Sequence, residues 1–88
     1  MTTYTKGEGF VANRSLILQK LGHGGPVPVM AGDNLEVVGV QNLAVIVVYA
    51  LEVHRHGALV TVVEASDNIL CALVKDKTLR VRLGVFGG

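Results

Sequence analysis

The stretch of residues 43–53, Leu-Ala-Val-Ile-Val-Val-Tyr-Ala-Leu-Glu-Val, constrains the fold more than any other part of the chain. It carries a single charge, Glu52, and its branched valine and isoleucine side chains fit a pleated strand better than a helix. It is also far shorter than the roughly 20 apolar residues that a membrane-spanning helix needs. We therefore expect a long strand in the middle of a sheet, and no association with a membrane.

Both faces of this expected strand are apolar almost to its end. One face carries Val45, Val47, Tyr49, Leu51 and Val53. The other carries Ala44, Ile46, Val48 and Ala50 before it becomes polar at Glu52 and His54. A strand in a simple antiparallel sheet has one solvated face, so the second face needs a cover. We predict that Ala44, Ile46, Val48 and Ala50 form an oligomer interface.

The composition supports self-association. A chain of 88 residues forms one domain and buries only somewhat more than about 60% of its unfolded surface. Yet 50% of its residues are hydrophobic and 17% are charged, below the roughly 25% of an ordinary soluble domain. The chain thus has more apolar surface than one small core can bury, and we expect a homo-oligomer or a place in a larger protein assembly.

Short apolar runs separated by turn residues indicate an all-β fold, a small antiparallel β-barrel or β-sandwich of about six to seven short strands. Residues 1–14 are polar and glycine-containing, and are expected to form a flexible N-terminal arm before a single β domain at residues 15–88. The expected strands are residues 15–21, 27–30, 35–40, 43–53, 58–64, 69–74 and 78–85.

Two of these assignments depend on local signals. Residues 15–21 also fit a short helix that Asn13 or Ser15 begins and Gly22 ends, which would cover the second face, but the β context favours a strand. Gln41-Asn42 is the expected hairpin turn into the central strand, because asparagine tolerates a positive φ angle. Residues 55–57, Arg-His-Gly, are the expected turn at its other end.

Few residues suggest chemistry. His54 and His56 would point to one side of a strand, a spacing that can bind a metal, with His23 as a third ligand. A polar hairpin tip is the favoured explanation of the pair, so we predict neither metal nor cofactor. Ser15, Ser66 and Cys71 lack the sequence context of an activated nucleophile, and we expect no enzymatic activity.

A basic strand face is the second candidate site. Arg80 and Arg82 alternate with apolar residues and follow Lys75 and Lys77 in the preceding turn, with Arg55 as a further cation. This face could contact RNA or DNA backbone, but the net charge is +1 and 5% of the residues are aromatic, without tryptophan, so a base-stacking platform is not evident. A solvated sheet face is the favoured interpretation.

Taken together, these features predict a non-enzymatic, self-assembling structural protein. Components of viral particles, such as capsid-decorating or tail subunits, share this low charge and surplus of valine, and a small oligomeric β-barrel that binds RNA or DNA is the alternative. Cys71 lies in an apolar run and is expected to be buried and unreactive. The first residues lack a basic-then-apolar signal, which favours the cytoplasm or a particle assembled there.

Overall fold

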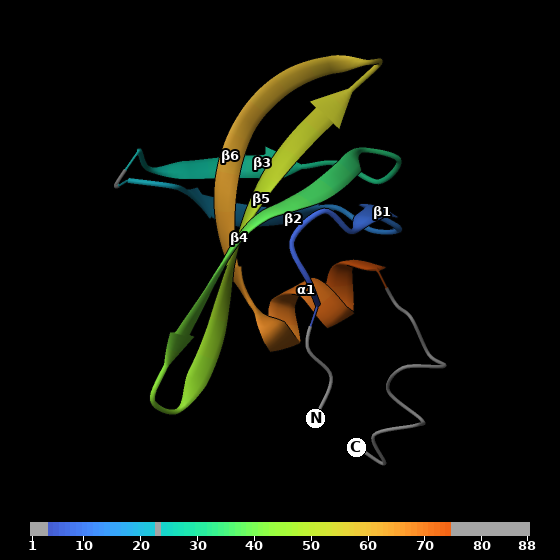
Figure 1. The fold of residues 1–88 in the computed structure, drawn as a ribbon. Coiled ribbons are helices and arrows are strands. Elements are labelled where there is room, and N and C mark those ends of the chain that lie inside the picture. The colour runs from blue at the N-terminus through green and yellow to red at the C-terminus, as the bar shows by residue number, and fades with distance from the viewer. Residues whose placement is uncertain (1–3, 23, 75–88) are drawn as a thin grey trace.

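The computed structural model describes residues 4–22 and 24–74, which form one six-stranded antiparallel sheet and one helix (Figure 1). The sheet order is β1-β4-β5-β6-β2-β3. The elements are β1 (Gly9–Val11), β2 (Leu16–Lys20), β3 (Pro26–Val29), β4 (Asn34–Leu43), β5 (Ile46–Arg55), β6 (Ala58–Ser66) and α1 (Asp67–Val74). The all-β class is confirmed, but the sheet is open and not closed into a barrel. The expected strand 78–85 lies outside the described residues.

Strands β4, β5 and β6 form a long meander, and β5 is its centre. Its alternate residues Val47, Tyr49, Leu51 and Val53 are buried, as period-2 alternation requires. The sheet curls so that Leu18 of β2 and Val29 of β3 reach the same core. We call the opposite surface of the meander, which carries residues 46, 48, 50, 52 and 54 of β5 and their cross-strand partners, the outer face.

The hairpin between β4 and β5 turns later than the sequence predicted. Asn42 pairs with Val47 and Leu43 pairs with Ile46, so the turn consists of Ala44 and Val45, and the prediction of a turn at Gln41-Asn42 is wrong. The later turn lets Gln41 and Asn42 add to the antiparallel ladder instead of leaving it. In Figure 1 this hairpin projects from the body of the molecule.

The turn between β5 and β6 is confirmed where it was expected. His56 has φ 54° and Gly57 has φ 79°, and a two-residue hairpin loop with both φ angles positive matches the right-handed twist of its strands. His56 is the one non-glycine residue with positive φ in the described part of the chain.

Residues 15–21 contain a strand, β2, as the β context favoured. Its partner β3 contains Pro26 and Pro28 and forms an edge of the sheet, where the missing N–H groups of proline leave no ladder bond unmade. The two prolines therefore fit the position of β3 at the edge of the sheet.

The expected strand at residues 69–74 is wrong, because these residues belong to helix α1. The Ser66 hydroxyl accepts a hydrogen bond from the Ile69 N–H at 3.4 Å, and Asp67 places a negative charge in the first turn. Leu70, Cys71, Leu73 and Val74 are buried, a helical spacing that a six-residue apolar run does not distinguish from a strand. No helix within residues 4–22 and 24–74 is long and apolar enough to cross a membrane.

The segment before β2, expected to be an arm, contacts the sheet and the helix. β1 pairs with β4, and Tyr4 is buried with its ring edge-on to those of Phe10 and Tyr49. Asn13 donates to two carbonyl oxygens at the end of α1, from its N–H to Leu73 and from its side chain to Val74. These bonds satisfy carbonyl groups that a helix end leaves without intrahelical partners.

The Tyr49 hydroxyl joins three parts of the fold. It accepts a hydrogen bond from the Tyr4 N–H at 2.9 Å and donates one to the Asp67 carboxylate at 3.1 Å. Burial, together with the nearby Asp67 carboxylate, raises the pKa of Tyr49 to about 12 against the opposing effect of the Tyr4 N–H. A strand, the helix and the N-terminal segment thus meet at one oxygen atom.

Replacing Tyr49 with phenylalanine should lower the free energy of unfolding by about 1–3 kcal/mol, because it removes one buried and one partly buried hydrogen bond while keeping the ring. Urea unfolding measures this change. A free energy of unfolding equal to that of the wild type in Tyr49→Phe would contradict this role of the Tyr49 hydroxyl.

The same hydroxyl should make stability depend on alkaline pH. Because the folded-state pKa of Tyr49 is raised from its usual 10.0 to about 12, the unfolded state loses this proton first. Its contribution to stability is complete below pH 10 and is lost as the pH rises through about 12. Wild-type stability should fall more steeply than that of Tyr49→Phe between those values, and parallel curves would contradict the assignment.

Candidate functional site

The predicted interface residues lie together on the projecting hairpin and the outer face beside it. Ile46, Val48 and Ala50 alternate along β5 on the outer face, and Ala44 lies in the turn. Ile46 is 49% exposed, and Val48 and Ala50 are half-buried, so the described residues leave this face partly open.

The apolar surface extends beyond the four predicted residues. Leu43, which pairs with Ile46, is 42% exposed, and Val45 in the turn is 89% exposed. A hollow lies between this hairpin tip and the start of α1, lined on the helix side by Ser66, Asp67 and Asn68. Sequence analysis missed Leu43 because it placed the turn before that residue.

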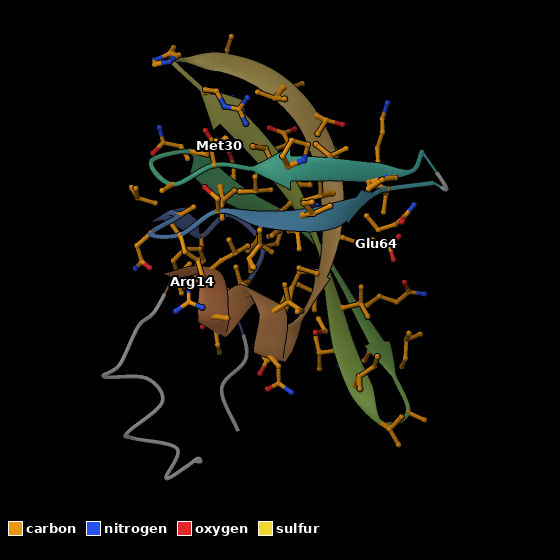
Figure 2. The ribbon with its side chains drawn as sticks, turned by 180° about the vertical axis from the view of Figure 1, so that it is seen from behind. Arg14, Met30 and Glu64 are labelled. Carbon is orange, nitrogen blue, oxygen red and sulfur yellow. The ribbon has the colours of Figure 1, made fainter. Side chains whose placement is uncertain are left out.

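Within the part of the chain that the structure describes, the outer edge of β4 is unpaired along the hairpin. β1 pairs with β4 only from Asn34 to Glu36, and Val37 adds backbone bonds to Gly7 and Glu8. Beyond Val37, no described strand pairs with this edge of β4. Figure 2 shows Glu64, on β6, near the place where the hairpin leaves the body, so a charge lies at the base of the apolar segment.

Arg55, predicted to belong to a nucleic-acid face, is held by a buried carboxylate. Its Nε and one terminal nitrogen each donate to an oxygen of Asp33 at 2.8 Å, and the guanidinium also donates to the Pro28 carbonyl at 3.3 Å. The other predicted members, Lys75, Lys77, Arg80 and Arg82, lie outside the described residues. The described part of the site therefore contains a structural arginine.

Asp33 lies in the turn between β3 and β4 and is 2% exposed. Its carboxylate also accepts from the Met30 N–H at 2.8 Å, at the turn labelled by Met30 in Figure 2. The Arg55 guanidinium lowers the pKa of Asp33, helped by the Met30 N–H and opposed by burial. Backbone bonds in both directions connect this turn to Ala12, just after β1.

The histidines suggested as a metal pair have different surroundings. His56 lies in the hairpin turn, whereas the His54 Nε2 atom lies 2.9 Å from a carboxylate oxygen of Glu52. Glu36, from β4, completes a group whose ligand atoms all lie within 4.8 Å of one another. Sequence analysis missed it, although the spacing of Glu52 and His54 on one strand face was a usable signal.

The three nucleophile candidates have structural contacts. The Ser15 hydroxyl accepts from the Ala31 N–H at 3.1 Å, and the Ser66 hydroxyl caps α1. Cys71 is buried, as predicted, beside the Tyr4 hydroxyl. Its low reactivity stays a prediction, which slow labelling of the native protein by a thiol reagent would support.

Comparison with known proteins adds no assignment. No protein-family model matches the sequence, and neither the curated proteins nor the solved structures contain a significant match.

Asp33→Asn should lower the melting temperature by several degrees, because the amide keeps an acceptor for Met30 but loses the ionic pairing with Arg55. Since the pKa of Asp33 is lowered in the folded state, its contribution is present above its usual value of 3.8 and is lost as the pH falls through the folded pKa. Thermal unfolding followed from pH 7 to pH 2 measures both effects.

Glu64→Gln is the control for this substitution, because within the described residues Glu64 has no ion pair. It should unfold like the wild type at neutral pH. If Asp33→Asn kept both the wild-type melting temperature and the wild-type acid dependence, the structural role of the Asp33–Arg55 pair would be wrong.

Proposed function

We propose that the protein is a non-enzymatic structural subunit that self-associates through the projecting β4–β5 hairpin and the adjoining outer face. The unpaired edge of β4 beyond Val37 carries the proposal. An exposed edge presents a row of backbone N–H and C=O groups to another strand, and a long apolar edge without a cover favours association. Here the edge continues into the exposed tip at Leu43 and Val45.

A second copy of the chain is the partner that this surface fits best. From Val37 to Leu51 no residue is charged, so the hairpin itself matches another apolar surface. Two β4 edges can pair antiparallel about a two-fold axis, and each copy then supplies the same patch to the other. In that antiparallel arrangement the apolar tip of each hairpin, which contains Leu43 and Ile46, would lie beside the β4–β5 hairpin of the other copy.

The proposal that the subunit belongs to a larger assembly rests on the composition of the chain. A capsid-decorating or tail subunit of a viral particle combines low charge, abundant valine and extensive contacts between copies, and this chain has the first two properties. The hairpin supplies a surface for the third. Glycine and valine content alone would suit many β proteins, so the hairpin edge is the more specific support.

Ile46→Asp should convert the oligomer into a monomer of 9.3 kDa without unfolding it. Ile46 is half-exposed in the single chain, so a carboxylate there stays solvated until an interface forms. Loss of about 1.5–3 kcal/mol of side-chain burial per copy, plus the cost of desolvating the charge, should weaken association at least about 100-fold. Analytical ultracentrifugation measures the mass, and circular dichroism checks the fold.

Ile17→Asp is the matched control, because Ile17 is 72% exposed but lies on β2, away from the hairpin. It should leave the oligomer intact. The proposal would be abandoned if the wild type were monomeric at about 100 µM, a concentration at which even weak interfaces associate. Equal dissociation of both variants would instead assign the interface to another surface.

A further inference from the structure

Glu36, Glu52 and His54 form a group of metal-ligating side chains on the outer face. Glu36 is the cross-strand partner of Glu52, and His54 follows Glu52 by two residues on the same side of β5. All three ligand atoms lie within 4.8 Å of one another. Two paired strands therefore fix the positions from which these side chains extend.

The charges of this group are not balanced within the described residues. Two carboxylates directly opposite on neighbouring strands repel each other. Glu52 contacts the His54 ring, but Glu36 has no ion pair in the described part of the chain, and the adjacent cation, Arg55, pairs with Asp33. A cation between the carboxylates would remove this repulsion.

Space for an ion is available beside Glu36. Its partner on β1 is Gly9, which has no side chain to place beside the carboxylate. An open hollow at this position has Gly9, Glu36 and His54 among its lining residues. A Cβ atom at Gly9 would meet nothing closer than the Leu35 carbonyl oxygen, at 3.7 Å.

We propose that Glu36, Glu52 and His54 bind a zinc(II) ion, with water in the fourth position. One imidazole and two carboxylates are ligands that zinc accepts, whereas magnesium and calcium prefer an all-oxygen set. Zinc bonds of about 2.0–2.1 Å in a tetrahedron place ligand atoms about 3.3 Å apart. The His54–Glu52 distance of 2.9 Å is already close to this value, and the exposed Glu36 side chain can move toward it.

The test is a zinc titration of the full chain, stripped of metal with a chelator and monitored by calorimetry. The absorption spectrum of cobalt(II) bound in place of zinc reports the coordination geometry. Wild type should bind a single ion that millimolar magnesium does not displace. His54→Ala and Glu36→Gln should each weaken binding at least about tenfold, since each removes a ligand of a three-ligand site. His56→Ala is the matched control and should bind like the wild type, because His56 lies in the turn and outside the group.

Two results would overturn the zinc site. One is the absence of wild-type binding at about 100 µM zinc, a concentration that saturates a site with a micromolar dissociation constant. The other is equal loss in His56→Ala and His54→Ala, which would assign binding to the hairpin turn. Circular dichroism confirms that each variant is folded. The same titration in Ile46→Asp separates the site from self-association, because its ligands come from one chain.

Discussion

The buried Asp33 carboxylate is the contact on which the open sheet depends. A sheet that does not close has two edges that can separate, here β1 and β3. Asp33 organises the turn that follows β3, and the same turn exchanges backbone bonds with Ala12, just after β1. Arg55, at the end of β5, supplies the positive charge that offsets the desolvation of the buried Asp33 carboxylate. The two edges and the central strand are thus joined without a closed ladder.

Coverage of the inner face explains the rest of the architecture. Within the described residues the inner face of the meander packs against Leu18 and Val29 of the curled strands β2 and β3, and against two short pieces, α1 and the segment around Tyr4. The Tyr49 hydroxyl binds both pieces, which gives them a fixed position over the core. Nothing comparable covers the outer face within the described residues, and this asymmetry leaves the apolar residues of β5 available to a partner.

Sequence reasoning predicted the strands more reliably than their ends. The β-branched run around β5, the proline-bearing edge strand β3 and the turn at His56-Gly57 follow from side-chain shape, missing donors and positive φ. The β4–β5 turn and helix α1 did not follow. At the β4–β5 turn, cross-strand pairing outweighed the turn preference of Asn42. At α1, a six-residue apolar run fitted the period of a helix and that of a strand equally well.

The candidate sites show a similar division. The apolar face of β5 could be predicted because alternation within one strand needs no tertiary information. The Asp33–Arg55 pair could not, because its members are 22 residues apart and meet through the curl of the sheet. Glu36 likewise joins Glu52 only through the register of β4 and β5, which a turn misplaced by a few residues changes completely.

The outer face of β5 carries the proposed contact surface first and the proposed zinc ligands after it. Ile46, Val48 and Ala50 are apolar, and Glu52 and His54 follow them on the same side. Because side chains two residues apart on a strand face are neighbours, an ion at Glu52 would lie beside the proposed contact surface and not within it. Its charge would therefore remain near solvent, where it does not oppose burial of the apolar half. One rigid strand can in this way support an apolar contact and a metal ligand set without conflict between them.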